Sequence, residues 1–142
     1  MKPRSVLAVC IGNTCRSPMA EAIARSLLGN SVRVESAGLD AGEGEAPNRN
    51  AVAVMKKMGL DIGTHRTRNI GSVDANSFDL VVAMNASIAR RLAELGVDGR
   101  RIAELDIPDP IGSDINTYWS TARSIASQLK QVLGIPPETD TR

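Results

Sequence analysis

The chain has 142 residues, of which 42% are hydrophobic and 23% are charged, and its formal net charge is +1. This length suffices for one domain with a continuous hydrophobic core that needs no disulfide or structural metal. The balanced charge gives no basic footprint for nucleic acid or an anionic membrane, and no stretch reaches the roughly 18 apolar residues of a membrane-spanning helix.

The N-terminal residues are basic and then apolar, but the apolar run is short and has no small-residue cleavage site. They are therefore unlike a signal peptide, and we expect a cytoplasmic protein. The two cysteines, Cys10 and Cys15, are too few and too close together to form the disulfide framework of a secreted domain.

Strands and helices alternate along the chain. Residues 5–9, SVLAV, form a continuous apolar run that is typical of a strand covered on both faces. Pro18 can occupy the first turn of the following helix, and Asn48 can cap the next one. In chain order we expect a strand over 5–9, a helix over 19–29, a strand over 32–36, a helix over 51–59, a strand over 78–84, a helix over 86–96, a strand over 101–105 and a helix over 117–134.

This alternation predicts one α/β domain over residues 1–135, with a Rossmann-like, four-stranded, parallel twisted sheet and helices on both faces. Residues 136–142 are predicted to be a C-terminal tail. Ligands of such sheets bind beyond the carboxyl ends of the strands. The loop 9–18 after the first strand and the loop 106–114 after the fourth both lie there, so we look for a site between them.

The loop VCIGNTCRSP, residues 9–18, holds both cysteines and is closed by Arg16. A loop between a strand and a helix N-terminus directs several backbone N–H groups at one point, and the helix dipole adds to the positive field. Gly12 and Asn13 tolerate backbone conformations closed to most residues. The guanidinium of Arg16 fits two oxygens of a tetrahedral anion. The pattern predicts a phosphate-binding loop, and its glycine spacing excludes the Walker type.

A thiol at the start of such a loop is held in a positive field that favours the thiolate, so Cys10 is the candidate nucleophile. Ser17 can donate its hydroxyl to that thiolate. In-line attack on a bound phosphate would give a phosphocysteine, and the leaving group would then need a general acid. We choose Asp109 over Asp106 for this role because the prolines on both sides of Asp109 restrict its backbone.

The residues 10–18, CIGNTCRSP, resemble the signature loop of the low-molecular-weight protein tyrosine phosphatases. The resemblance covers nearly the whole chain, because several further segments are similar to those of the family. These segments are SAG at 36–38, THRTR at 64–68, FDLVVAM at 78–84 and Asp109-Pro110.

The resemblance implies a role for each matching residue, and it implies neither a metal nor an organic cofactor. Cys10 would be the nucleophile, Arg16 the phosphate clamp, and Asp109 the acid and then the base. Ser17 would belong to the catalytic set, and Asn13, Ser36 and His65 would support the loop. The implied phosphate-binding residues are Ile11, Gly12, Asn13, Thr14, Cys15 and Arg16.

Simpler interpretations of the cysteine pair are a tight turn with two buried thiols and a zinc site. With two cysteines and one histidine in the chain, tetrahedral zinc coordination is hard to complete. Cys15 either packs in the interior or traps an oxidised Cys10 as a reversible disulfide, and the sequence leaves both open. A non-catalytic anion-binding module is a third class, against which the set Cys10, Arg16 and Asp109 argues.

The sequence leaves the substrate open among three chemical classes. Protein phosphotyrosine comes first, although Ile111 stands where the family's tyrosine phosphatases usually carry aromatic residues. Thr14 stands where isoleucine is frequent in those enzymes and resembles the protein-arginine phosphatase branch. Arsenate reductases share the loop, but residues 84–92 contain no cysteine, so a reductase would depend on an external small thiol. We expect phosphorylated protein substrates and a monomer.

Overall fold

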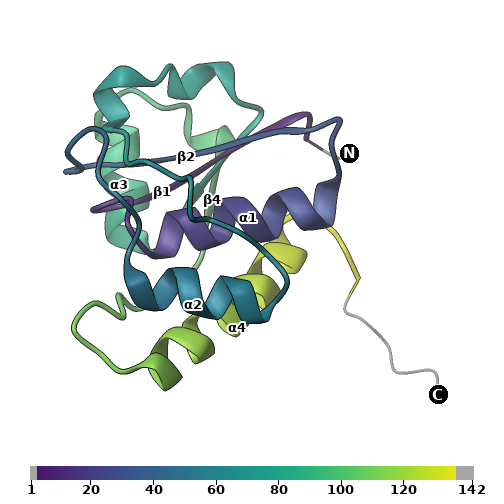
Figure 1. The fold of residues 1–142 in the computed structure, drawn as a ribbon. Coiled ribbons are helices and arrows are strands. Elements are labelled where there is room, and N and C mark those ends of the chain that lie inside the picture. Colours follow the sequence, from purple (N-terminus) through teal and green to yellow (C-terminus); the bar gives the residue numbers. More distant parts are fainter. Residues whose placement is uncertain (1–2, 137–142) are drawn as a thin grey trace.

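The computed structural model describes residues 3–136, which form four strands and four helices (Figure 1). In chain order these are β1 (Ser5–Cys10), α1 (Arg16–Leu28), β2 (Arg33–Gly38), α2 (Arg49–Lys57), β3 (Leu80–Ala83), α3 (Ala86–Glu94), β4 (Ile102–Glu104) and α4 (Ile115–Val132). Short 3-10 helices span Ile70–Ser72, Ala75–Ser77 and Gly99–Arg101. The predicted alternation of strand and helix is confirmed. Of the predicted tail, residues 137–142 lie outside the described residues.

The four strands form one sheet in the order β2-β1-β3-β4, and every neighbouring pair is parallel, as predicted. β1 is buried along its whole length between its two neighbours. The chain leaves β1 for β2 on one side and later returns to β3 on the other. The carboxyl end of β1 is therefore the point where the topology switches, and ligands of open parallel sheets bind at that point.

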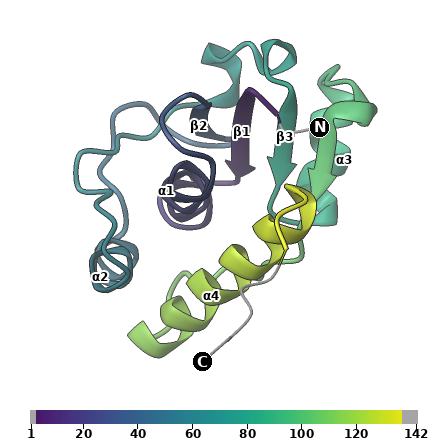
Figure 2. The same cartoon turned by 90° about the vertical axis from the view of Figure 1, so that its right-hand side faces the viewer.

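The helices cover both faces of the sheet. The crossovers β1–α1–β2 and β3–α3–β4 run in opposite directions across the sheet, and since such crossovers are right-handed, α1 and α3 lie on opposite faces. Figure 2 shows α3 apart from α1, α2 and α4. α4 packs against both α1 and α2. None of the described helices is long and apolar enough to cross a membrane.

The buried face of α1 is wider than a single helical stripe. Met19 and Ile23 are buried, and so are Ala20 and Ala24, while Ser26 is exposed. The reason is that α1 packs against β1 and β2 on one side and against α4 on another. The buried surface of this helix is therefore wider than that of a helix lying on a sheet alone.

Side-chain caps fix the starts of the later helices. Asn48 accepts hydrogen bonds from the N–H groups of Asn50 and Ala51 at 2.8 and 3.3 Å, so its predicted role as the cap of α2 is confirmed. Asp114 accepts from the N–H of Thr117 at 3.0 Å, and α4 therefore begins at Ile115, slightly earlier than expected.

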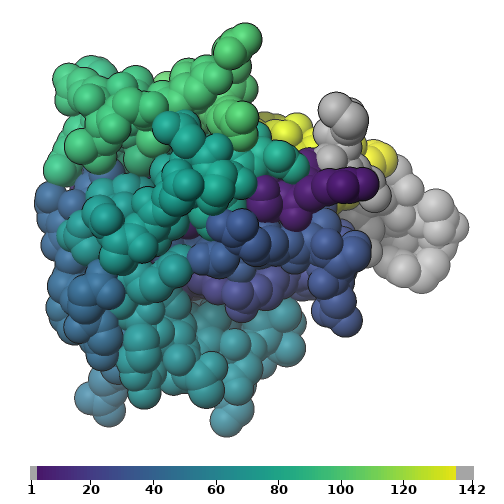
Figure 3. Space-filling view, turned by 90° about the horizontal axis from the view of Figure 1, so that it is seen from above, coloured from purple at the N-terminus to yellow at the C-terminus, as the bar shows by residue number. Residues whose placement is uncertain are grey.

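The segment after α2, drawn in teal, spreads over the molecule beside the blue residues of β2 (Figure 3).

Gly38, the last residue of β2, allows this segment and the loop after β1 to approach closely. A Cβ at this position would lie 2.6 Å from the Ile11 carbonyl oxygen and 2.9 Å from the Asn13 nitrogen. The N–H of Gly38 also donates to the carbonyl of Arg68 at 2.9 Å. A side chain at residue 38 would therefore clash with main-chain atoms of the loop. These atoms cannot move aside in the way that the end of a flexible side chain can.

We expect Gly38→Ala to lower the free energy of unfolding by about 2 kcal/mol, because the added methyl group overpacks a contact with backbone. Thermal unfolding should show a Tm lower by roughly 5 °C. Gly99→Ala is the matched control, since nothing lies within 4 Å of a Cβ built there. Equal melting temperatures for the two variants would contradict the close approach.

Candidate active site

The loop Ile11–Cys15 joins β1 to α1. Four carbonyl oxygens of residues 10–14 point to its outer side, where hydrogen bonds from the rest of the fold hold them. Each of them accepts a hydrogen bond from a different residue elsewhere in the fold. The pairs are Cys10 with the N–H of Leu39 (2.9 Å), Ile11 with the N–H of Asp40 (2.9 Å), Asn13 with Nε2 of His65 (2.8 Å) and Thr14 with the N–H of Asn48 (2.8 Å). All four carbonyl oxygens on the outer side of the loop are thus hydrogen-bonded.

The anchored carbonyls determine where the loop's amides point. A trans peptide is planar, so its N–H points away from its C=O. The amides that follow the four anchored carbonyls are therefore turned toward the inside of the loop, and none of them donates to another group among residues 3–136. They belong to Ile11, Gly12, Thr14 and Cys15. Four unpaired donors on one side of a loop form a binding site for an anion.

Asn13 holds the centre of the loop in a left-handed conformation, with φ 57°. Its buried side chain donates to the hydroxyls of Ser17 and Ser36 at 2.8 and 3.0 Å and accepts from the N–H of Arg68 at 2.9 Å. Such a backbone conformation costs free energy in a residue other than glycine and persists where surrounding bonds hold it. The structure thus brings together Asn13, Ser36 and His65, the residues expected to support the loop.

Cys10 ends β1 under this loop, and its side chain is buried. Its sulfur lies 2.9 Å from the hydroxyl oxygen of Ser17 and accepts from the N–H of Asn13 at 3.2 Å. Because the Ser17 hydroxyl already accepts from the Asn13 amide, its own proton is available to the sulfur. Both donors would stabilise a thiolate more than a thiol.

Cys15, the residue before α1, lies in a different environment. Burial, together with the negative charges of Cys10 and Asp109, raises the pKa of its thiol to about 12. Cys15 is therefore a neutral thiol at neutral pH. Both cysteines are free in the structure.

Arg16 begins α1 with its guanidinium buried and only partly satisfied. One terminal nitrogen donates to the Ile107 carbonyl at 2.9 Å, and the other lies 3.6 Å from the carboxylate of Asp109. Its Nε is a buried donor without a partner among the described residues. An unsatisfied buried donor is costly, and an anion in the loop would supply the missing acceptor.

The first turn of α1 adds to this field. Its cap residue, Cys15, makes no side-chain capping bond, and Pro18 has no N–H to satisfy. The helix N-terminus therefore faces the loop uncapped, and its dipole favours a negative charge there.

The acid loop, residues 106–114, brings Asp109 and not Asp106 to the site. The Asp109 carboxylate lies 3.8 Å from the Cys15 sulfur and accepts from the N–H of Ile111 at 3.1 Å. It is 42% exposed, so it can meet both a ligand and water. Asp106 is exposed, and its backbone bonds to the side chain of Gln128 on α4. The neighbouring Ile107 supplies the carbonyl that holds Arg16, a contact that the sequence did not indicate.

Glu21 is a supporting residue that sequence reasoning missed. Its carboxylate accepts from the hydroxyl of Ser36, lies 3.9 Å from Nδ1 of His65 and pairs with Arg25. It thereby connects two of the predicted supporting side chains. The available signal was its spacing, because Glu21 follows Ser17 by four residues and so lies on the same face of α1.

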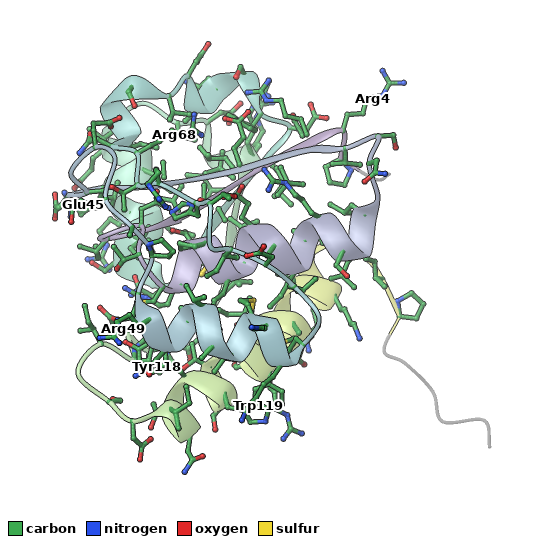
Figure 4. All side chains as sticks on the ribbon, viewed as in Figure 1. Arg4, Glu45, Arg49, Arg68, Tyr118 and Trp119 are labelled. Atoms are coloured by element: carbon green, nitrogen blue, oxygen red, sulfur yellow. The ribbon has the colours of Figure 1, made fainter. Side chains whose placement is uncertain are left out.

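The three aromatic residues of the chain do not surround the loop as exposed rings. Phe78 and Tyr118 are fully buried, and Trp119 is partly buried against the core. Figure 4 shows Tyr118 on the side of Arg49, while Trp119, the next residue of α4, lies toward the other end of α2. Tyr118 therefore presents no exposed ring to the loop. Ile111 is the large apolar side chain that the acid loop exposes, at 61%.

Comparison with known proteins identifies relatives over nearly the whole chain. The family described as low molecular weight phosphotyrosine protein phosphatase matches residues 5–139. The probable low molecular weight protein-tyrosine-phosphatase EpsP of Ralstonia nicotianae is 34% identical over 122 residues, which are 81% of this chain and 83% of that protein. Arsenate reductase 2 of Staphylococcus haemolyticus is 28% identical over 133 residues, 94% of this chain and 95% of that protein.

Solved structures give the same fold. The tyrosine phosphatase Wzb from Escherichia coli K30 in complex with sulphate superposes with a TM-score of 0.84 at 29% identity, covering 94% of this chain and 98% of that one. The arginine phosphatase YwlE from Geobacillus stearothermophilus superposes with a TM-score of 0.83 at 27% identity, covering 93% and 92%. The fold class expected from the sequence is thus confirmed.

The two thiols should differ in reactivity toward iodoacetamide. At about neutral pH we expect Cys10 to be alkylated and Cys15 to stay unmodified, because only a thiolate reacts and the pKa of Cys15 is raised to about 12. Labelling of Cys15 should rise only as the pH approaches that value. Peptide mass spectrometry measures both sites, and inorganic phosphate should protect Cys10.

The control is the chain unfolded in denaturant, where both thiols should react. Alkylation of Cys15 as fast as Cys10 in the folded protein would contradict the difference in environment.

Proposed function

Because the chain belongs to the low molecular weight phosphotyrosine protein phosphatase family, we propose that it hydrolyses protein phosphotyrosine through a phosphocysteine intermediate on Cys10. The observation that carries the proposal is the combination, at one loop, of a buried sulfur, four inward amides and the buried guanidinium of Arg16, whose Nε has no partner among the described residues. These groups fit a tetrahedral dianion above a nucleophile.

The first chemical step transfers the phosphoryl group to sulfur. The Cys10 thiolate attacks phosphorus in line, so that an S–P bond forms while the P–O bond to the leaving group breaks. The loop amides and Arg16 stabilise the charge on the equatorial oxygens. Asp109 gives its proton to the departing oxygen, which leaves as a neutral hydroxyl.

The second step returns the enzyme to its starting state. The Asp109 carboxylate accepts a proton from water as the water oxygen attacks phosphorus, and the S–P bond breaks. Inorganic phosphate leaves, and Cys10 is again a thiolate that Ser17 stabilises by its 2.9 Å contact. Asp109 is again protonated and can serve the next turnover.

Asp109 and Arg16 lie 3.6 Å apart in the ligand-free site. An incoming phosphate competes for the donors of Arg16, including the unpartnered Nε. The Asp109 carboxyl is then released toward the leaving group, and its partial exposure leaves room for that group. Substrate binding and placement of the acid are coupled in this way.

Phosphoarginine is a second candidate substrate. Thr14 offers a hydroxyl at the edge of the loop, and no exposed aromatic side chain is present to stack on a phenyl ring. One similar structure is named an arginine phosphatase. A linear guanidinium stem fits the exposed aliphatic side chain of Ile111 as well as a ring does.

Arsenate reductases are also relatives, and arsenate has the shape of phosphate. Reduction of arsenate consumes two electrons, which the relay of a thioredoxin-coupled reductase draws from further cysteines, and residues 84–92 contain none. A reductase would need an external small thiol as co-reactant.

We place the protein in the cytoplasm as a monomer acting on phosphorylated proteins.

Asp109→Asn should lower kcat/KM for phenyl phosphate by about 100-fold and that for p-nitrophenyl phosphate much less, because a good leaving group needs no proton. We use kcat/KM across a series of aryl phosphates because it reports P–O cleavage, whereas kcat also includes the second step, in which Asp109 is the base. Asp106→Asn is the matched control, since that residue is exposed on the same loop. An unchanged dependence on leaving group in Asp109→Asn would reassign the acid.

One purified sample should be tested on phosphotyrosine peptide, phosphoarginine peptide, and arsenate with glutathione. We expect phosphotyrosine turnover to lead. We also expect Thr14→Ile to lower phosphoarginine turnover relative to phosphotyrosine by about tenfold, because one hydroxyl contact to the guanidinium is lost. Phosphoarginine turnover that leads, or arsenate reduction alone, would overturn the assignment to phosphotyrosine.

A further inference from the structure

We propose that Asn48, the cap of α2, is a positioning residue for the phosphate-binding loop: its backbone N–H holds the Thr14 carbonyl outside the loop and thereby aims the Cys15 N–H at the substrate. The inference rests on the proposed function, because it assigns how one donor of that site is oriented.

The peptide between Thr14 and Cys15 is fixed from one side only. The Thr14 oxygen accepts from the N–H of Asn48 at 2.8 Å, and no other donor reaches it among residues 3–136. Since the peptide is planar, this bond turns the N–H of Cys15 to the opposite side, into the loop. Without the hydrogen bond from Asn48, the peptide would be free to rotate, and the Cys15 N–H would no longer point into the loop.

Asn48 is well suited to hold that carbonyl, because its own position is fixed by the helix that it caps. Its side-chain oxygen accepts from Asn50 and Ala51, and its carbonyl accepts from Val52 at 3.0 Å. Its backbone is extended, with φ −60° and ψ 138°. The N–H that points at Thr14 is therefore as rigid as the first turn of α2.

The helix that Asn48 caps also connects this point to α4, because α2 packs against α4. Tyr118, on the first turns of α4, is buried. Figure 4 shows Tyr118 near Arg49, the first residue of α2. Asn48 is thus where the loop, α2 and α4 meet.

The helix α4 follows directly from the loop that carries Asp109, and Asp114 caps it. The packing of α2, which Asn48 caps, against α4 therefore connects the Thr14 side of the phosphate-binding loop to the element that follows the general acid. A change at Asn48 should alter oxyanion affinity and turnover together, in contrast to a change that only weakens the fold.

The experiment compares Asn48→Pro with Asn48→Ala. Both substitutions remove the capping oxygen, but only proline also removes the N–H that binds Thr14. Proline fits the backbone angle here, because φ is −60°. Its ring carbon takes the place of the N–H that lies against the Thr14 oxygen, so the carbonyl loses its donor and is pushed out of position. The difference between the two variants therefore reports the loss of this backbone anchor.

We expect Asn48→Pro to bind vanadate about tenfold more weakly than Asn48→Ala and to lose kcat/KM by a similar factor, because one charge-assisted donor is no longer aimed. Asn48→Pro should also have a lower Tm than Asn48→Ala, because the Thr14 carbonyl loses its donor, so both variants are compared well below the lower Tm. Equal vanadate affinity and equal kcat/KM would overturn the assignment. Vanadate affinity is measured without turnover, so it tests Asn48 even if the wild-type chain hydrolyses none of the proposed substrates.

Hydrogen exchange in the wild-type chain provides a second test that needs no variant. When vanadate occupies the loop, the Cys15 N–H is engaged and the Thr14 carbonyl is held in place. The Asn48 amide should then exchange several-fold more slowly than in the free protein. An Asn48 amide that exchanges at the same rate in both states would contradict the coupling, and it would do so even if Asn48→Pro failed to fold.

Discussion

Planarity of the peptide bond is the constraint on which this site depends. The loop after β1 has few side chains that could bind an anion, so its backbone must supply the donors. Four carbonyls of residues 10–14 are held outside by bonds from separate parts of the fold, and the following amides are thereby turned inward. The direction of these amides is thus set by hydrogen bonds on the outer side of the loop.

The fold places the residues that hold these carbonyls where they are needed. Leu39 and Asp40 follow β2, which lies beside β1, while His65 and Asn48 come from the long connection between β2 and β3 that passes the same end of the sheet. Gly38 lets that connection approach the loop. The buried guanidinium of Arg16 then supplies a positive charge, and its Nε, which has no partner among residues 3–136, would gain an acceptor from a bound anion.

The sequence was sufficient to predict the parallel sheet, its four strands, and the loop with Cys10 and Arg16, because these depend on local patterns and on strand order. The hydrogen bonds on the outer side of the loop could not be predicted. Every residue except proline has a main-chain N–H, so the identity of Asn48 does not reveal which carbonyl its N–H binds. Glu21 could have been found from its spacing to Ser17. The wide buried face of α1 could not be predicted, because its packing against α4 depends on tertiary structure.

The most direct test of this account is a search for the phosphorylated enzyme during turnover. The wild-type chain is mixed with excess p-nitrophenyl phosphate, quenched in acid within the first turnover, and digested for mass spectrometry. The account predicts a burst of nitrophenol matched by one phosphoryl group per chain on the sulfur of Cys10. A phosphoryl group on any other residue, or turnover by a Cys10→Ser variant at the wild-type rate, would contradict it.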